Sequence, residues 1–490
     1  MSSHEPGLVK FIKKSVLQTA RKIFNDYGYG IEAEELIKRI GIISKKEGFK
    51  SFLVGGFPRD VIIYILKSYH KRGVSNISNR YKTSEIFSSN SKFLDLDVAT
   101  DGDPEKLAFS IKNNARFLKI HKRFGTASIE YLAGGIPLKT DIAALRTESY
   151  ACPGVLPQVN TGKATLKDDV IRRDFTINTL AFSINPEDFL ELKDYIGGLS
   201  DIFKKKIRVL HALSFIDDPT RIFRAVRFEK RLKFRIDGKT LELLKAALDE
   251  NVLDKISGKR ITAELTILLK EKKPEIYLAR LDSLGVLSHI YGKLRFTKKN
   301  KIVFSKISNY FDNPKNISVS RLRRIYKEIE ADIFYKAEIF SGLNNTEFNE
   351  AAKRLNMGGK VEKTLKTMYS GLEMINNLEK NNFLYLNKKP AEIYDNLDKI
   401  CIRSILFYLF QESGKDAAGF NFRRIAVKYI NKVIFIKPSV NGNDIRALGI
   451  CEGPLYGKIL SEIKNLKISG KLKSKEDEIK YIKEKYLKNN

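Results

Sequence analysis

Residues 92–107 read KFLDLDVATDGDPEKL, and the alternation within this stretch decides how the first part of the chain is interpreted. Apolar and polar residues alternate from Leu94 to Val98, which predicts a half-buried β-strand. On such a strand Asp95 and Asp97 point to the same face, about 6.5 Å apart along the chain. Two neighbouring anions repel each other, so the pattern indicates either a bound cation or an outward face that solvent covers.

The composition is that of a globular protein with a large positive charge. The 490 residues are 43% hydrophobic and 30% charged, with 89 Lys and Arg against 58 Asp and Glu, a net charge of +31. Such an excess predicts a polyanionic partner, nucleic acid first and an anionic membrane second, although lysines on solvated helix faces would give the same numbers. The apolar runs are shorter than the ~18 residues that span a bilayer. The N-terminus does not resemble a secretory leader and the three cysteines are far apart, so we expect no membrane and a reducing cytoplasm.

The patterns along the chain predict an α/β region followed by a helical one. Residues 8–24 form an amphipathic pattern, which we expect to dock on the next domain, and a second helical pattern covers residues 33–47. Residues 52–182 mix strand and helix patterns, and from residue 194 the patterns are helical nearly to the end.

A third carboxylate falls on a predicted neighbouring strand. RFGTASIEYL and IPLKTDIAALR are strand patterns joined by Ala133-Gly134-Gly135, which predicts a hairpin whose second strand carries Asp141. Mg²⁺ is usually held by one or two carboxylates together with substrate phosphates, so Asp95 and Asp97 are candidate metal ligands and Asp141 a supporting carboxylate. The alternative is a solvated edge strand with outward aspartates.

A glycine turn precedes the second candidate site. Gly55-Gly56 follows the strand FLV and precedes a helical pattern, so the backbone there can approach a phosphate and the helix N-terminus adds partial positive charge. Arg59, one turn into the helix, is placed to reach the same anion. An ordinary strand-to-helix turn would have the same sequence.

RRDFTINTLAF, residues 172–182, places two arginines and an aspartate before an apolar stretch that we expect to be helical. The planar guanidinium of Arg173 suits bidentate contact with a triphosphate. Asp174 suits a hydrogen bond from a ribose hydroxyl, and equally suits the N-cap of the following helix.

SFIDDPTRIFRAVRF, residues 214–228, predicts a helix start with Asp218 as N-cap and Pro219 in the first turn. Asp218 and Arg221 are then neighbours on one helix face, either as an exposed ion pair or as a reader of bases. A carboxylate accepts from an exocyclic amine while a guanidinium donates to a ring nitrogen. Cytosine and adenine offer that pair, whereas guanine and uracil would leave buried groups unpaired at roughly 1–3 kcal/mol each.

Taken together and in order, these motifs resemble the class II tRNA nucleotidyltransferase (CCA-adding enzyme) and bacterial poly(A) polymerase family. The matching segments are LVGGFPRD, DLDVAT, KRFGTASIEY, DIAALRTESY, DDVIRRDFTINTLAF, DYIGGLSDIFKKKIRVLHALSFIDDPTRIFRAVRFEKRL, ISGKRITAEL and the tail-like SVNGNDIRALGICEGPLYGKIL. The resemblance is dense from residue 52 to residue 268 and recurs near the end.

The resemblance implies a polymerase β-like α+β head followed by an elongated, all-helical neck, body and tail. The expected parts are an N-terminal helical extension (1–48), the head (49–186), the neck with the base template (187–272), the body (273–385) and the tRNA-binding tail (386–490). It implies two-metal transfer of C, A or both from CTP and ATP to the 3′ end of tRNA, with pyrophosphate released, Mg²⁺ as cofactor, and tRNA gripped at its acceptor stem and elbow. The implied nucleotide-binding residues are Gly55, Gly56, Arg59, Arg173, Asp174, Asn178, Asp218, Arg221, Arg224 and Arg227, with Asp95, Asp97 and Asp141 as the catalytic carboxylates.

The sequence departs from the family pattern at three places. Asp217 stands where glutamate usually precedes the template aspartate, Pro58 replaces an aliphatic residue, and residues 68–93 form an insertion. Full CCA, CC-only and A-only addition all stay open, as does poly(A) polymerisation within the same family. The remoter alternatives are a catalytically inactive RNA-binding protein and transfer to a small acceptor, which would leave the basic helical half without a function.

Overall fold

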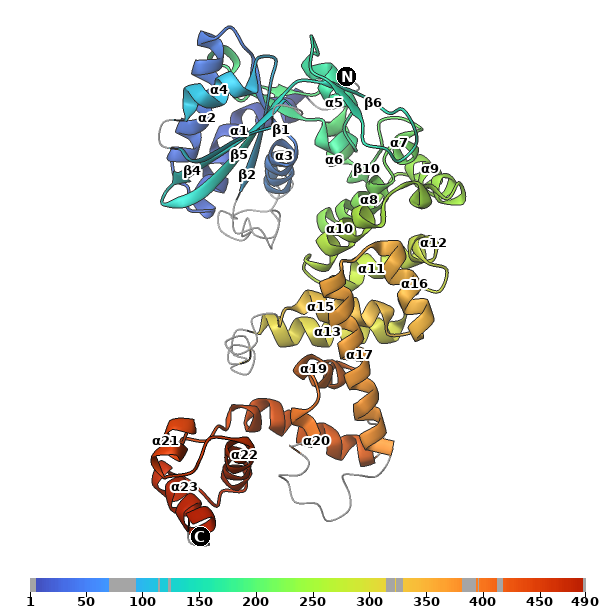
Figure 1. Ribbon diagram of the computed structural model, residues 1–490. Helices are drawn as coiled ribbons and strands as arrows, with labels where there is room; N and C mark the ends of the chain where they lie inside the picture. Colours follow the sequence, from blue (N-terminus) through green and yellow to red (C-terminus); the bar gives the residue numbers. More distant parts are fainter. Residues whose placement is uncertain are drawn as a thin grey trace. The chain divides into compact units, whose positions relative to one another are not determined.

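The computed structural model describes residues 6–69, 94–112, 115–121, 125–313, 322, 329–380, 394, 396–411 and 417–487. The chain divides into two compact units, residues 1–295 with 353–356 and residues 296–352 with 357–490, and each is considered by itself. The first unit holds a mixed β-sheet with helices, and the described part of the second is helical (Figure 1). The predicted α/β head and largely helical remainder are therefore confirmed. Of the predicted insertion, residues 70–93 lie outside the described part.

Seven strands form the main sheet of the first unit, in the order β3-β4-β5-β2-β1-β8-β9. Neighbouring strands are antiparallel except β2 and β5, which are parallel. The strands are β1 (Ser51–Val54), β2 (Asp95–Thr100), β3 (Ala115–His121), β4 (Thr126–Ala133), β5 (Ile136–Ala144), β8 (Ala181–Ser183) and β9 (Leu192–Lys193). The strand predicted from the aspartate alternation is thus β2, at the centre of the sheet.

The predicted hairpin joins β4 to β5. Ala133 pairs with Ile136, so Gly134 and Gly135 are the two turn residues, with φ of +57° and +76°. Two consecutive left-handed residues form the kind of turn whose twist matches that of the strands it connects, and glycine adopts this conformation without strain. The turn therefore fixes the register of β5, and the prediction is confirmed.

Helices α1 (Pro6–Asp26), α2 (Glu32–Lys46), α3 (Gly56–Tyr69) and α4 (Pro104–Ile111) pack around the sheet in the first unit (Figure 1). The apolar stripe predicted for residues 8–24 is buried, with Ile12, Val16 and Ile23 almost inaccessible to solvent. Phe24 of α1 stacks on Phe57 of α3 with ring centroids 5.5 Å apart. The docking of this helix on the following domain is therefore confirmed.

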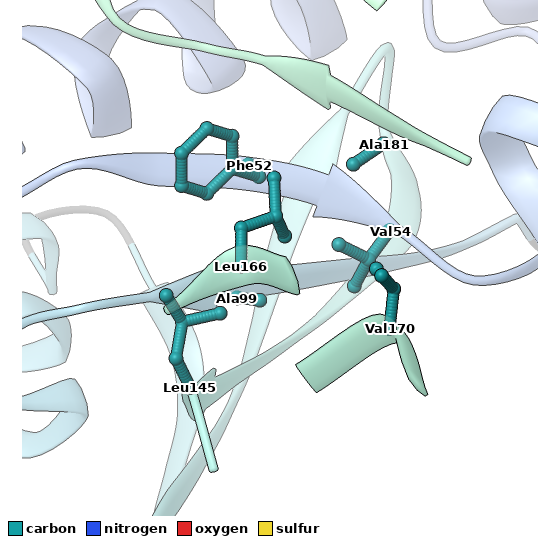
Figure 2. Close-up of a cluster of buried hydrophobic side chains, with 7 residues drawn as sticks. All are labelled: Phe52, Val54, Ala99, Leu145, Leu166, Val170 and Ala181. Carbon is teal, nitrogen blue, oxygen red and sulfur yellow. The ribbon is translucent and has the colours of Figure 1, made fainter. Parts of the chain in front are cut away.

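Besides the contacts with α1 to α4, the sheet also packs against helix α5 (Leu166–Ile171) through a cluster of apolar side chains. Figure 2 shows the buried cluster, which consists of Phe52, Val54, Ala99, Leu145, Leu166, Val170 and Ala181. Phe52 and Val54 alternate along β1, and Ala99 belongs to β2, so this cluster identifies the sheet face that α5 covers. Asp95 and Asp97 share the face of Ala99, because residues two apart on a strand point the same way.

The rest of the first unit is mostly helical but contains two small sheets. One pairs β6 (Thr147–Ser149) with β7 (Gln158–Asn160), and the other pairs β10 (Lys206–Ile207) with β11 (Arg235–Ile236). The helices are α6 (Gly198–Phe203), α7 (Ser214–Asp217), α8 (Thr220–Leu232), α9 (Gly238–Asp249), α10 (Gly258–Leu269), α11 (Glu275–Ser283) and α12 (Val286–Ile290). The second small sheet corrects the purely helical pattern expected after residue 194.

The second unit is built from helices with aromatic packing between them. They are α13 (Lys298–Asp312), α15 (Ala331–Phe340), α16 (Asn345–Leu355, whose last residues are grouped with the first unit), α17 (Gly359–Lys380), α19 (Ile402–Phe410), α20 (Ala417–Asn431), α21 (Gly442–Ala447), α22 (Pro454–Ile468) and α23 (Lys475–Ile482). Phe334 and Phe410 meet edge to face at 5.4 Å in this core. Within the described residues, every helix of the chain is too short or too polar to cross a membrane.

Candidate active site

The three predicted carboxylates lie on two adjacent strands of the main sheet. Asp97 on β2 is the register partner of Asp141 on β5, and Asp95 is the partner of Lys139. Paired residues of parallel strands project to the same face, so all three aspartates emerge on the face that carries Ala99. The structure therefore brings these carboxylates to one surface of the sheet, as the alternation predicts.

The glycine turn after β1 lies against Asp97. Gly55 has φ of +76°, and a Cβ atom built on it would come within 2.7 Å of Asp97 Oδ2. Glycine is thus required both by the backbone conformation and by the approach of the carboxylate. Helix α3 begins at Gly56, so its first N–H groups lie beside the same carboxylate. The turn predicted to hold phosphate and the predicted metal ligand are neighbours.

The electrostatics of this surface suit a cation. Burial raises the pKa of Asp97 to about 6; Asp141 and Asp95 also raise it, and Arg173 opposes them. The carboxylate of Asp141 is only partly hydrogen-bonded: Oδ2 accepts from Lys139 Nζ at 2.8 Å, while Oδ1 is buried without a hydrogen-bond partner. Oxygen atoms in this condition fit a hard divalent ion. In the described part of the chain, no group of three or more acidic, His or Cys side chains is arranged to hold a metal by itself, so water and substrate oxygens would complete the coordination of an ion at Asp95 and Asp97.

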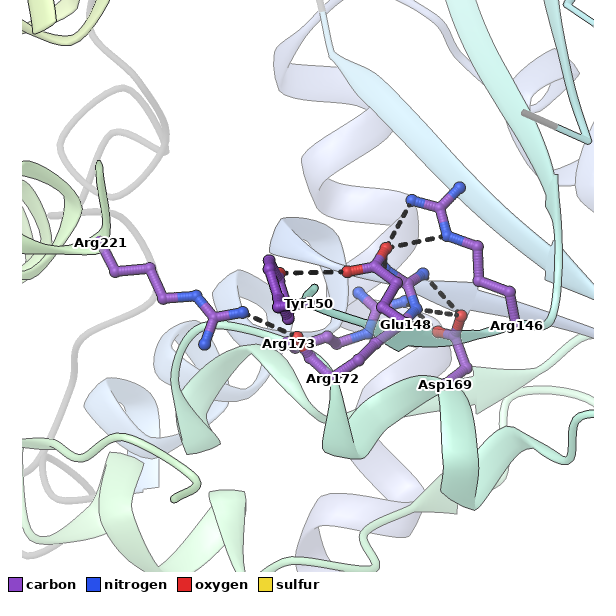
Figure 3. Close-up of polar contacts among 7 residues, drawn as sticks. All are labelled: Arg146, Glu148, Tyr150, Asp169, Arg172, Arg173 and Arg221. Carbon is purple, nitrogen blue, oxygen red and sulfur yellow. Dashed lines mark hydrogen bonds and ion pairs between the residues drawn. The ribbon is translucent and has the colours of Figure 1, made fainter. Parts of the chain in front are cut away.

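The arginines that follow α5 form a network with acidic side chains (Figure 3). Arg172 donates to Asp169 and to Glu148, at 2.6 and 2.7 Å, and Arg173 donates to Asp169 at 2.7 Å. Burial raises the pKa of Asp169, but Arg173 and Arg172 outweigh it and hold the pKa below its usual value. Arg173 Nε is buried without a hydrogen-bond partner, so one donor of this guanidinium remains to be satisfied.

Asp174 and Asn178 lie inside a buried polar network. Asp174 Oδ1 accepts from the N–H of Phe175 and from Asn178 Nδ2, and Oδ2 accepts from Arg224 Nε and Nη2 at 2.8 and 2.6 Å. Asn178 Oδ1 in turn accepts from Arg59 Nη1 at 2.7 Å. The residues predicted to contact the nucleotide thus bond to one another, and their contact with a nucleotide stays a prediction.

The segment after Asp174 differs from the predicted apolar helix. It forms a short 3₁₀ turn, Thr176–Asn178, followed by strand β8. The sheet overrides the local helical pattern because Phe182 pairs with Leu53 of β1 and is fully buried there.

Helix α8 presents the remaining arginines. Arg59 and Arg224 lie over the ring of Phe228 at 5.1 and 5.7 Å, so one aromatic side chain supports both guanidinium groups. Arg227 Nε donates to Glu271 Oε1 at 2.6 Å. These contacts make Arg224 and Arg227 parts of the folded core around α8, whatever else they bind.

The predicted template pair is arranged differently from the expectation. Helix α8 begins at Thr220, one residue later than predicted, although Asp218 Oδ1 does accept from the N–H of Thr220 at 3.1 Å. Arg221 does not pair with Asp218: its Nη1 donates to Ser214 Oγ at 2.6 Å and its Nη2 to the carbonyl of Arg172 at 3.0 Å (Figure 3). The simple intrahelical ion pair is therefore wrong, and Arg221 is buried between α7 and the segment after α5.

Arg260 on α10 is the partner of Asp218 and was missed by the sequence reasoning. Its Nη2 donates to Asp218 Oδ1 at 2.7 Å and its Nη1 donates to the carbonyl of Gly154 at 2.6 Å. The signal was available, since Arg260 lies in the ISGKRITAEL segment that matches the family pattern. Its distance in sequence from Asp218 hides the contact from any argument based on local spacing.

Comparison with known proteins identifies the class first. Residues 51–208 match the family described as the poly A polymerase head domain, and residues 233–295 match a probable RNA and SrmB binding site of polymerase A. The A-adding tRNA nucleotidyltransferase of Geobacter sulfurreducens is 31% identical over 91% of this chain, which spans about half (46%) of that relative. The A-adding enzyme of Halalkalibacterium halodurans is 28% identical over 92% of both chains.

Solved structures agree over nearly the whole length. A CCA-adding enzyme in complex with CTP has a TM-score of 0.66 and 26% identity, covering 97% of this chain and 98% of that one. The Thermotoga maritima CCA-adding enzyme complexed with tRNA has a TM-score of 0.63 and 25% identity, covering 92% and 95%. These matches, which extend along most of the chain, support a class II tRNA nucleotidyltransferase.

Proposed function

We propose that this protein adds C, A or both to the 3′ end of tRNA, using CTP and ATP and releasing pyrophosphate. The observation that carries the proposal is the placement of Asp95, Asp97 and Asp141 on one sheet face, beside the Gly55 turn, in a chain of this family. Of the named relatives that match along most of this chain, two are A-adding enzymes and two are CCA-adding enzymes, so both kinds of addition fall within the proposal. The proposed location is the cytoplasm.

The proposed cofactor is Mg²⁺, held by Asp95 and Asp97 with Asp141 in support. Bound there with a triphosphate, it would supply the Lewis acid that lowers the pKa of the RNA 3′-hydroxyl and balances the charge developing on the phosphates. The protein's own part is to bind and orient the substrates. Gly55 and Gly56 leave the backbone open to a phosphate at the start of α3, and Arg173 brings an unsatisfied N–H donor to the Asp97 side of the sheet.

Base choice is assigned to Asp218 and Arg221. Both already have protein partners, Arg260 for the carboxylate and Ser214 with the Arg172 carbonyl for the guanidinium. These partners hold the two groups in place, and a carboxylate and a guanidinium retain capacity for further hydrogen bonds. Cytosine and adenine match such a pair, whereas guanine and uracil present a donor to the guanidinium and an acceptor to the carboxylate.

The deciding experiment is extension of tRNA transcripts ending before CCA, at CC, or at CCA, with CTP alone, ATP alone or both. Growth only by the missing C or A residues supports the proposal and sorts CCA, CC and A addition. A long ladder with ATP alone would instead identify a poly(A) polymerase, the alternative that the head-domain match also allows. If Asp95→Ala and Asp97→Ala proteins extend RNA as well as wild type, the active centre lies elsewhere or the activity belongs to a contaminant.

A further inference from the structure

The segment that joins α1 to α2, residues 27–31, is fastened together with Glu32, the first residue of α2, to the turn between β4 and β5 and to Leu94, the residue before Asp95. We call residues 27–32 the clasp. Gly28 has φ of +82° and its Cβ position lies 2.7 Å from Ile136 Cδ1, while its carbonyl oxygen would lie 2.1 Å from a Cβ atom on Gly134. Glu32 Oε2 accepts from the N–H of Gly134 at 2.8 Å. Two backbones therefore meet at glycine positions, and the clasp fits against the turn that sets the register of β5.

Tyr29 connects the clasp to the start of β2, the strand that bears Asp95 and Asp97. Its side chain is fully buried, its hydroxyl donates to the carbonyl of Pro137 at 3.1 Å, and it accepts from the N–H of Leu94 at 2.9 Å. Leu94 directly precedes Asp95, whose register partner on β5 is Lys139. The hydroxyl thus bridges β2 and β5 just before their first paired residues, where it satisfies two backbone groups that face each other across the strands.

From this geometry we infer that Tyr29 is a positioning residue for the metal site and that the N-terminal helices serve to hold it. Asp95 is the most exposed of the residues on β2 and sits at the end of its strand, where pairing on one side stops. Without the tyrosine hydroxyl, Leu94 loses its connection to Pro137, and Asp95 becomes the last residue of β2 that is held to β5. The end of β2 is then held less firmly, so the distance between the carboxylates of Asp95 and Asp97 varies more and the two groups bind an ion less well. This inference rests on the proposed function, because it concerns the ion that the proposed reaction uses.

The experiment measures Mn²⁺ binding to the full chain without nucleotide, by the loss of the electron paramagnetic resonance signal of free Mn²⁺. Tyr29→Phe removes one oxygen atom and should weaken binding about tenfold, as is typical when the outer support of a metal ligand is lost. Tyr131→Phe is the matched control, because the Tyr131 hydroxyl also donates to a buried backbone carbonyl in the same part of the fold, that of Ile111 at 2.6 Å. It should bind Mn²⁺ as wild type does. Raising the Mn²⁺ concentration should restore extension activity to Tyr29→Phe.

The inference is overturned if Tyr29→Phe binds Mn²⁺ as tightly as wild type, or if Tyr131→Phe weakens it equally. Should Tyr29→Phe not fold, Glu32→Ala takes its place. Its affinity for Mn²⁺ should fall about threefold, because one hydrogen bond to the turn is lost. An unchanged affinity for Mn²⁺ in this variant would overturn the inference. An Asp97→Asn protein separates the two proposals. Mn²⁺ binding that needs Asp97 but not Tyr29 leaves the proposed function standing, whereas a wild-type protein that binds no Mn²⁺ contradicts both.

Discussion

Buried carboxylates are treated differently at two places in the first unit. On β2 and β5 the carboxylate of Asp141 lacks a full set of partners, whereas the carboxylate of Asp174 is paired with Arg224 of α8. Asp97 is held at a raised pKa, and Asp141 keeps a buried oxygen without a partner. Asp174, in contrast, receives two hydrogen bonds from Arg224, and its pKa is lowered because that pairing outweighs its burial. The acidic surface on β2 and β5 is only partly paired, whereas the charge of Asp174 is balanced within the protein by Arg224. Loss of charge should therefore help folding at one place and damage it at the other.

Asp97→Asn is the sharpest test and should separate activity from stability. Removing a metal ligand should lower the rate of tRNA extension by about a thousandfold or more, since metal catalysis contributes several kcal/mol to the transition state. The folded pKa of about 6 lies above the ordinary value of 3.8, so ionisation of Asp97 lowers stability progressively as the pH rises from 3.8 to 6 and by a constant amount above 6. The variant should gain about 1–2 kcal/mol in urea unfolding at pH 8 with EDTA present. Equal or lower stability would show that the carboxylate is not under strain.

Arg224→Met should have the opposite effect on stability. Asp174 would be left buried without its ion-pair partner, which typically costs about 3–5 kcal/mol. Urea unfolding at pH 8 measures the loss, and Arg224→Lys is the control that keeps the positive charge without the two-pronged donor. A loss below about 1 kcal/mol in Arg224→Met would contradict the view that Arg224 balances the buried charge of Asp174.

Glu338 in the second unit tests whether burial alone, without neighbouring anions, raises the pKa of a carboxylate enough to lower stability. Its Oε1 accepts from Asn300 Nδ2 at 2.8 Å, and burial raises its pKa to about 7. The unfolded chain ionises near the ordinary 4.5, so stability should fall as the pH rises from 4.5 to 7 and then level off. Glu338→Gln keeps the hydrogen bond to Asn300 and should remove up to about 3 kcal/mol of this loss at pH 8, with little change at pH 4. A pH-independent difference between the two proteins would rule out the titration.

Asp218→Ala should produce the smallest change in free energy, confined to base choice. The preference for CTP and ATP over GTP and UTP should fall by roughly 10- to 100-fold in kcat/KM, because one of the two reading groups is lost. Phosphoryl transfer to the preferred base should be slowed less than this. Arg260→Ala, which frees the same carboxylate without removing it, is the matched control. An equal loss for all four nucleotides would contradict the template assignment.

Sequence periodicity was sufficient for the sheet and insufficient for the arginine contacts. The alternation around Asp95, the Gly134-Gly135 turn and the apolar stripe of α1 each depend on neighbours in sequence, and each was predicted correctly. Pairing of Asp97 with Asp141 follows from a strand order that alternation alone does not specify. Asp218 pairs with Arg260, 42 residues away, and Arg221 donates to the carbonyl of Arg172, 49 residues away, so the local spacing that suggested a mutual pair was misleading. The helix expected after Asp174 was wrong because β-pairing with β1 outweighed a helical pattern only a few residues long.

The two-glycine turn between β4 and β5 has a consequence for how this protein can vary. A residue inserted there that shifted the pairing of β5 by one position would turn every side chain of β5 to the opposite face, sending Asp141 away from Asp97 and apolar residues into water. The length of this turn must therefore stay fixed for Asp141 to remain beside Asp97, and Gly134 must stay glycine because a Cβ atom there would meet the carbonyl oxygen of Gly28.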